Sequence, residues 1–292
     1  MAPAFGKIVV CGVGLIGGSF ALALKAAGAA SQVCGIGRSR ATLDEALRRG
    51  LIDRVGACDA ATLGDADLVL LATPVGQMPQ LMQAMAPHLG EHSVVTDGGS
   101  TKGDVIAAAR RFLPRQLGRF VPAHPIAGAE NSGAAAARAD LYAGRKVVLT
   151  PLPENDADAL ARVRAAWAAC GAEVHEMAPD RHDQVFAAVS HLPHLLSFAL
   201  VHELAGREDR EEFFRFAASG FRDFTRIAAS HPEMWRDICL ANRAALLGEL
   251  ERYQGQLETL HRALLEQDAA AIEAVFAEAR TVRRAWDEGK LS

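Results

Sequence analysis

The stretch Gly12-Val13-Gly14-Leu15-Ile16-Gly17 decides the fold of the first half of this chain. It follows the apolar run 7–11, which reads as a strand, and it leads into residues 19–27, which read as a helix. In a G-x-G-x-x-G loop the three glycines allow a tight turn, a close approach of pyrophosphate to the backbone and close helix–strand packing. Free N–H groups at the helix N-terminus then attract phosphate. We predict a dinucleotide site whose contacts include Gly12, Gly14, Leu15, Ile16 and Gly17.

Short apolar runs alternate with helical segments outward from this loop. The expected strands are 7–11, 32–37, 67–73, 93–97, 120–123, 146–150 and 173–176, and the expected helices include 19–27, 41–50 and 158–170. Such alternation is typical of βαβ units in a parallel sheet. Thr73 and Pro74, at the end of the third strand, are also predicted to contact the cofactor. We therefore expect a Rossmann-type α/β domain over residues 1–178.

The character of the sequence changes near residue 178, because almost no strand signal follows. An apolar helix is expected over 180–204, with a kink near Pro193. Leu246, Leu250, Tyr253, Leu257, Leu260 and Leu264 recur at steps of four and three residues. This seam indicates helix packing, either inside one chain or between the two subunits of a homodimer. We expect an all-α domain over residues 179–292 that carries substrate contacts and the dimer interface.

Composition narrows the class of protein. The chain has 292 residues and a formal net charge of −4, which gives no overall attraction to nucleic acid. No apolar run is long enough to predict a membrane span, and we expect no leader before the first strand. The five cysteines form no C-x-x-C pair, so we interpret them as free thiols of a cytoplasmic protein. No metal site is predicted.

The residues after the second expected strand indicate which dinucleotide is bound. NAD enzymes usually place Asp or Glu there to bind the ribose 2′-hydroxyl. This chain has Arg38-Ser39-Arg40 instead, with no carboxylate before Asp44. Two guanidinium groups and a hydroxyl suit a 2′-phosphate, so we predict NADP in preference to NAD. The alternative is a solvated basic turn.

Two clusters follow strands of the expected sheet, where ligands of such sheets bind. Residues 97–103 (D-G-G-S-T-K-G) form a loop before a helix, which is either part of the site or a simple helix cap. His124 follows the expected strand 120–123, and a neutral imidazole there can take a proton at neutral pH. A lone histidine is also often structural.

Two further clusters lie in the helical half. In Ser190-His191-Leu192-Pro193-His194, the two imidazoles are three residues apart and share one helix face. No third ligand has fitting spacing, so we discount a metal site. Asp223 and Arg226 are also three residues apart. They form either a helical ion pair or an arginine held ready for a substrate carboxylate.

Five motifs in one order give the chain a specific resemblance. These are G-x-G-L-I-G-G-S, the D-x-G-S-x-K loop, H-P-I-A-G-x-E-x-S-G, S-H-L-P-H, and G-F-R-D-F-T-R-I-A followed by Met234-Trp235-Arg236. Together they resemble the prephenate/arogenate dehydrogenase family of tyrosine biosynthesis, over nearly the whole chain. That family transfers hydride from C4 of a cyclohexadiene to nicotinamide, releases CO₂ from C1 and leaves an aromatic ring.

The resemblance implies roles for individual residues. His124 is similar to the family's catalytic histidine, which takes the proton of the 4-hydroxyl, and Ser100 to the serine that orients it. Arg226 resembles the arginine that binds a substrate carboxylate. The remaining implied contacts are His194 and His191 on the substrate side, Glu130 as a gating or polar residue, and Asp223 as a positioning residue. The family is also dimeric through its helical domain.

Two other classes of protein would also contain a dinucleotide-binding domain of this kind. β-Hydroxyacid dehydrogenases pair a Rossmann domain with a helical one, but they use a lysine of the second domain. Residues 179–289 of this chain contain no lysine, which argues against that class. A non-catalytic NADP sensor would be expected to lose His124 or Arg226, and both are present. The sequence leaves open whether the substrate is prephenate or arogenate, and whether tyrosine inhibits.

Overall fold

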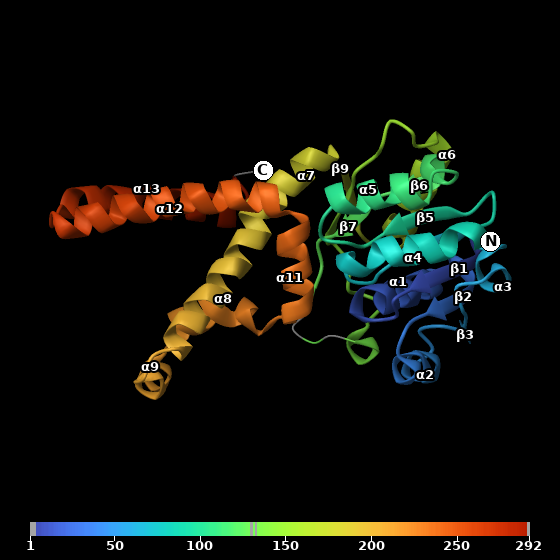
Figure 1. Ribbon diagram of the computed structural model, residues 1–292, viewed down its shortest axis with the longest axis horizontal. Coiled ribbons are helices and arrows are strands. Elements are labelled where there is room, and N and C mark those ends of the chain that lie inside the picture. Colours follow the sequence, from blue (N-terminus) through green and yellow to red (C-terminus); the bar gives the residue numbers. More distant parts are fainter. Residues whose placement is uncertain (1–3, 129–130, 132, 291–292) are drawn as a thin grey trace. The chain divides into compact units, whose positions relative to one another are not determined.

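A computed structural model of the chain describes residues 4–128, 131 and 133–290. The chain divides into two compact units, residues 1–243 and 244–292. The first unit contains two sheets and most of the helices, and the second contains a pair of long helices (Figure 1). The boundary expected between residues 178 and 179 remains a prediction.

The larger sheet of the first unit has six parallel strands in the order β3-β2-β1-β4-β5-β6. They are β1 (Phe5–Cys11), β2 (Ala30–Ile36), β3 (Arg54–Val55), β4 (Leu68–Leu71), β5 (Val94–Asp97) and β6 (Phe120–Val121). The strand order reverses between β1 and β4. In parallel sheets, ligands bind beside such a reversal, at the carboxyl ends of the strands.

Helices cover both faces of this sheet, because side chains alternate along each strand. Ile8 and Val10 of β1 belong to one buried core, and Val9 and Cys11 belong to the other. The first core includes side chains of α1 (Leu15–Ala26), α2 (Arg40–Arg48) and α6 (Ala157–Ala169). The second includes side chains of α3 (Ala60–Leu63), α4 (Met78–Met85) and α5 (Gly103–Phe112). The predicted Rossmann-type domain is therefore confirmed.

A smaller sheet differs from the sequence-based expectation. It contains β7 (Ala123–Pro125), β8 (Lys146–Leu149) and β9 (Glu173–Glu176). β7 is antiparallel to β8, and β8 is parallel to β9. The single strand expected over 120–123 is thus wrong: β6 ends at Val121, and His124 lies inside β7 rather than after a strand of the main sheet. Pro122 explains the break, because proline has no N–H group to continue a ladder.

The apolar segment after residue 178 contains α7 (Pro179–Phe186), a π-helical turn (Ala187–His191) and α8 (Leu192–Ala205). Pro193 lies in the first turn of α8, directly after the π-helical turn. Because proline has no N–H group to donate to the preceding turn, it favours this break in the regular helix. By length and composition alone, the 27-residue run Pro179–Ala205 could cross a membrane. It carries the buried polar residues His182 and His191, both hydrogen bonded within the first unit.

Shorter helices complete the first unit, and a long helix pair forms the second. The short helices are α9 (Arg210–Phe216), α10 (Ser219–Thr225) and α11 (Pro232–Ala241). α12 (Arg243–Leu265) and α13 (Ala269–Asp287) are joined by a tight turn in which Asp268 caps α13, accepting the N–H of Ala271 at 2.9 Å. The expected helical second half is confirmed.

Candidate active site

The glycine loop has the geometry of a pyrophosphate cradle. Gly12 follows β1 with φ +96°, and a Cβ there would lie 2.6 Å from the carbonyl oxygen of Ala72. A Cβ on Gly17 would lie 2.1 Å from the carbonyl oxygen of Gly12, so neither position tolerates a side chain. Gly14 is the N-cap of α1, and its missing Cβ would meet no atom within 4 Å. The open space beside an uncapped helix N-terminus fits a dinucleotide phosphate.

Thr73 and Pro74 border this cradle from the neighbouring strand. The ideal Cβ position of Gly12 is 3.0 Å from the backbone nitrogen of Thr73. The hydroxyl oxygen of Thr73 is buried and has no hydrogen-bond partner among the described residues. Pro74 precedes the 3₁₀ turn Val75–Gln77. An unpartnered hydroxyl beside the glycine loop fits a polar group of the cofactor.

Three residues after β2, Arg38, Ser39 and Arg40, are predicted to contact the cofactor. Two of them, Ser39 and Arg40, also form local contacts in α2. Ser39 is the N-cap of α2 and accepts the N–H of Thr42 at 3.3 Å. Arg40 pairs with Asp44 across one helical turn, at 2.9 Å. Arg38 is exposed and has no ion pair with a described residue. Arg38 is therefore the cation most available to a bound phosphate.

His124 lies at one end of a buried hydrogen-bond chain. Its Nδ1 atom is 2.9 Å from Nε2 of His182, and Nδ1 of His182 is 2.8 Å from Oδ1 of Asp183. Phe186 packs edge-on against the ring of His124 and at a tilt against the ring of His182. Burial lowers the pKa of His124 well below its ordinary value, with further lowering by the nearby charges of His182 and Lys102. His124 is therefore neutral at pH 7.

An ion pair beneath β7 holds this histidine in place. Nζ of Lys102 lies 2.5 Å from Oδ2 of Asp97, and both side chains are fully buried. Lys102 also donates to the carbonyl oxygen of Ala123 at 2.7 Å, while Asp97 accepts the N–H groups of Gly99 and Ala123. The loop 97–103 is thereby attached to the residue before His124. Ser100, in this loop, is half-buried.

A second group of aromatic and polar side chains lies on the helices. His191 is 3.1 Å from the side-chain nitrogen of Asn242, and burial lowers the pKa of His191 to about 4. The ring of His194 stacks on Trp235 with centroids 3.5 Å apart. Nε2 of His191 and Nε1 of Trp235 are buried without a hydrogen-bond partner among the described residues. Buried polar atoms of this kind fit a polar ligand.

Of the other predicted substrate contacts, the structure places Arg226 near the group formed by His191, His194 and Trp235. Burial lowers the pKa of His194, and the charge of Arg226 lowers it further, so the guanidinium lies near that ring. Asp223 is exposed on α10. Glu130 lies outside the described residues.

Three residues of the site were not singled out from the sequence. His182 and Asp183 lie near the start of α7, and their contact with His124 could not be predicted locally, because His124 is 58 residues earlier. Trp235 stood in the motif after residue 228, yet its packing against His194 is a tertiary contact. A search for histidine–aspartate neighbours on the apolar helix would have found the first two.

The glycine cradle, the parallel sheet and the buried histidines define a nicotinamide-dependent oxidoreductase with an added helical part. The family model for the nucleotide-binding domain of prephenate dehydrogenase matches residues 20–176, and the model for its dimerization domain matches residues 178–278. The chain therefore belongs to the prephenate dehydrogenase family, and the alternative among the β-hydroxyacid dehydrogenases is not supported.

Individual proteins agree with this membership. The cyclohexadienyl dehydrogenase of Zymomonas mobilis is 37% identical over 283 residues, which is 96% of each chain. The crystal structure of prephenate dehydrogenase from A. aeolicus, in complex with hydroxyphenyl propionate and NAD⁺, is 35% identical with a TM-score of 0.87 and covers 96% of this chain and 97% of that chain. Synechocystis arogenate dehydrogenase is 31% identical with a TM-score of 0.80, over 96% of this chain and 99% of that chain.

Proposed function

We propose that this chain catalyses the oxidative decarboxylation of prephenate or arogenate, giving 4-hydroxyphenylpyruvate or tyrosine. The bound nicotinamide dinucleotide supplies the hydride acceptor, and the loop from Gly12 to Gly17, with Thr73 and Pro74, holds it. Relatives named cyclohexadienyl dehydrogenase, prephenate dehydrogenase and arogenate dehydrogenase support the reaction.

The observation that carries the proposal is the state of His124. A histidine that acts as a general base must be unprotonated at the working pH and must have a free ring nitrogen. Burial keeps His124 neutral, and His182 occupies only its Nδ1 atom. Nε2 is left to accept the proton of the substrate's 4-hydroxyl group as hydride leaves C4. The C1 carboxylate then departs as CO₂, and its bonding electrons complete the aromatic ring.

The remaining side chains bind and orient. Arg226 binds a substrate carboxylate, and His194, His191 and Trp235 form the wall against which the substrate lies. Ser100 orients His124 toward the hydroxyl from the loop 97–103. Asp223 positions the basic groups, and Glu130 serves as a gating or polar residue near the pocket. Alignment of C4 with the cofactor is the main contribution of the protein, because aromatisation supplies the driving force.

Steady-state turnover of prephenate and of arogenate, each with NAD⁺ and with NADP⁺, tests this proposal. We expect reduced cofactor to form with at least one pair, together with CO₂ in equal amount. Failure of all four pairs would contradict the proposal.

We further propose that NADP is preferred over NAD. Arg38 is the residue that supports this preference, because it is exposed beside the end of β2 and no carboxylate occupies the position that binds a 2′-hydroxyl. Arg40 adds less, since Asp44 already neutralises it. An equal or higher kcat/KM with NAD⁺ would contradict the preference.

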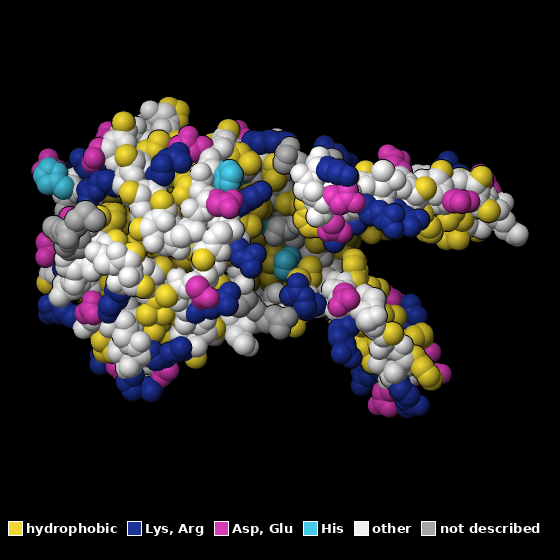
Figure 2. All heavy atoms as spheres, turned by 180° about the vertical axis from the view of Figure 1, so that it is seen from behind, with side chains coloured by type: hydrophobic (Ala, Val, Ile, Leu, Met, Phe, Trp, Pro, Cys, Tyr) yellow, Lys and Arg dark blue, Asp and Glu magenta, His cyan; other side chains and the backbone are white. Residues whose placement is uncertain are grey.

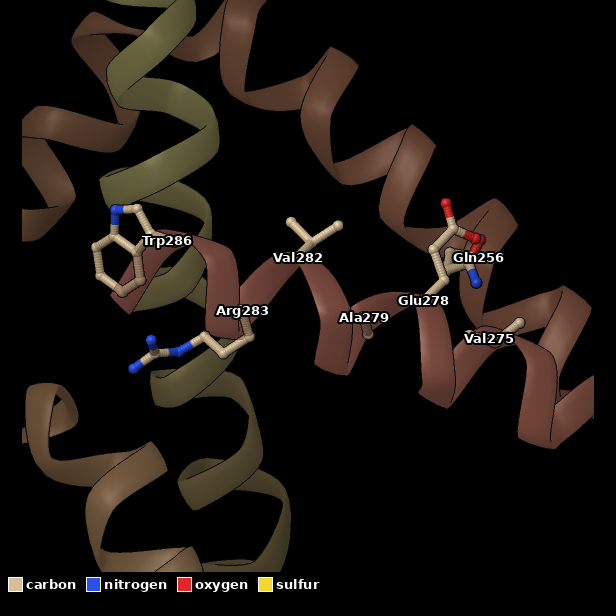
Figure 3. A pocket seen from close by; sticks show the side chains of 7 residues that line it. All are labelled: Gln256, Val275, Glu278, Ala279, Val282, Arg283 and Trp286. Carbon is tan, nitrogen blue, oxygen red and sulfur yellow. The ribbon is translucent and has the colours of Figure 1, made fainter. Parts of the chain in front are cut away.

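A homodimer in the cytoplasm is the assembly we propose. The helix pair of the second unit carries many exposed apolar side chains (Figure 2), among them Leu257, Leu264, Leu265, Phe276, Val282 and Trp286. Val275, Ala279, Val282 and Trp286 line an open groove of about 640 Å³, together with Gln256 of α12 (Figure 3). Of the leucine seam, only Leu246 is buried, which favours packing between subunits over a core within the chain.

Light scattering at micromolar concentration tests this assembly. We expect twice the mass of the 31.0 kDa chain. The substitution Trp286→Asp should shift the mass toward that of the monomer, because it replaces a large exposed apolar side chain of the proposed interface with a charge. A monomeric wild-type protein would contradict the dimer.

A further inference from the structure

The hydrogen-bond chain behind His124 ends in a firmly held carboxylate. Oδ1 of Asp183 accepts the backbone N–H of Lys102 at 2.9 Å, and Oδ2 accepts that of Gly103 at 2.8 Å. These N–H groups belong to the start of α5, a helix of ten residues whose positive end favours an anion. Burial alone raises the pKa of Asp183, but hydrogen bonds from His182 and the two backbone groups outweigh it and lower that pKa. Asp183 is therefore a carboxylate at neutral pH.

A charged carboxylate fixes where the protons lie along the chain. Asp183 can only accept, so Nδ1 of His182 carries a proton and donates it. Burial lowers the pKa of His182, and its ring is neutral at pH 7. A neutral ring with a proton on Nδ1 has none on Nε2, so Nε2 of His182 accepts. The donor to it, at 2.9 Å, is then Nδ1–H of His124.

We propose that His182 and Asp183 are positioning residues that hold His124 in the tautomer whose Nε2 atom is free to act as the base. This inference rests on the proposed function only for the role of His124. The order Asp–His–His places a carboxylate behind the base through an intervening imidazole, where a Ser-His-Asp triad places it directly.

The same chain stabilises the charge that His124 gains. When Nε2 takes the substrate's hydroxyl proton, the O–H bond breaks, an N–H bond forms and the ring becomes an imidazolium. The buried cation Lys102 disfavours this charge. Nε2 of His182 accepts a hydrogen bond from the new cation, and the negative charge of Asp183 lies one ring further on. The hydrogen bond to His182 and the negative charge of Asp183 both stabilise the imidazolium as it forms in the transition state. Their loss should therefore lower kcat.

Two substitutions of His182 separate the role of its hydrogen-bond acceptor from the role of its aromatic ring. His182→Phe keeps an aromatic ring against Phe186 but removes both nitrogens. His182→Gln keeps a carbonyl oxygen that can accept from His124. We expect His182→Phe to lower kcat by about 100-fold, within the range for loss of a well-placed proton-transfer group, with KM and cofactor affinity little changed. His182→Gln should recover about tenfold of that loss, because the glutamine restores the tautomer but no longer links His124 to the carboxylate of Asp183.

A matched control is His175→Gln, since His175 is exposed on β9 and outside the chain of contacts. Its kcat should equal that of the wild type. Thermal unfolding of each variant separates a loss of fold from a loss of positioning. A merely structural role for His182 would lower stability and leave the kcat of the folded protein unchanged, which would overturn the proposal.

The tautomer itself can be read without any substrate. Long-range ¹H–¹⁵N correlation spectra of ¹⁵N-histidine-labelled protein distinguish Nδ1–H from Nε2–H rings, and His124→Asn assigns the signal. We expect His124 as the Nδ1–H form in the wild type. The Nε2–H form would overturn the inference. If no substrate is turned over, the proposed function fails, and the spectrum still decides the arrangement of protons.

Discussion

The imidazole of His194 stacks on the indole of Trp235, with ring centroids 3.5 Å apart and planes 18° from parallel. Nδ1 of His194 donates to the carbonyl oxygen of Ser190 at 2.9 Å, so Nε2 is the nitrogen left for other contacts. Arg226 lies near enough to lower the pKa of this ring. A stacked platform beside a guanidinium is suited to a ring-shaped substrate that bears a carboxylate.

The first prediction concerns Arg226. Arg226→Ala should raise KM for substrate by about 10- to 100-fold, because a charge-assisted hydrogen bond contributes roughly 1.5–3 kcal/mol to binding. The kcat at saturating substrate should change less. Arg222→Ala, on the exposed surface of α10, is the matched control and should leave KM unchanged. An unaltered KM in the Arg226 variant would remove this residue from the binding site.

The second prediction concerns the buried ion pair. Lys102→Met leaves the Asp97 carboxylate without its cation in the protein interior, which should destabilise the fold by about 3–5 kcal/mol. Urea unfolding measures this loss. Asp65→Asn breaks the exposed pair with Lys7 and should have little effect. If both variants unfold at the same urea concentration as the wild type, Lys102 does not anchor the loop.

The third prediction concerns cofactor choice. Arg38→Ala should lower kcat/KM for NADP⁺ by about tenfold while leaving that for NAD⁺ nearly unchanged, because only NADP⁺ carries the 2′-phosphate. Arg40→Ala should have the smaller effect, since Arg40 is already paired with Asp44. Equal losses with both cofactors would mean that Arg38 does not contact the 2′ position.

The fourth prediction follows from three buried histidines. Burial lowers the pKa values of His124, His182 and His191, the last to about 4. Below pH 6.5 the unfolded chain therefore binds protons that the folded chain does not, and the free energy of unfolding falls as pH decreases. Each such group can contribute up to about 1.4 kcal/mol per pH unit.

Urea unfolding at pH 7.5 and pH 5.5 measures this dependence. Stability should be lower at pH 5.5, and His191→Gln should reduce the difference between the two values. A free energy of unfolding that stays constant across this range would show that these rings are not held neutral.

The fold was largely predictable because its signals are local. The G-x-G-x-x-G loop, the apolar strand 68–71 and the helix after residue 157 each depend on neighbours in sequence. The placement of His124 was not predictable, because the chain passes from the larger sheet to the smaller one at Pro122. The cap that Ser39 forms on α2 is a local feature as well, and its expected contact with the cofactor stays a prediction.

The candidate site was predictable only in part for the same reason. His124 and the helical histidines carry recognisable motifs, so their positions could be proposed from the sequence. The contact between His124 and His182 spans 58 residues and depends on how α7 packs beside β7, which no local pattern reveals. The same holds for the stack of His194 on Trp235.

The central claim is that His124 is the base in an oxidative decarboxylation. The most direct measurement compares cofactor reduction with prephenate and with arogenate by the wild type and by His124→Asn. We predict turnover by the wild type, and a loss of kcat of about 10²- to 10⁴-fold in the variant while cofactor binding persists. A variant with near-normal kcat, or a wild type inactive toward both substrates, would contradict the account.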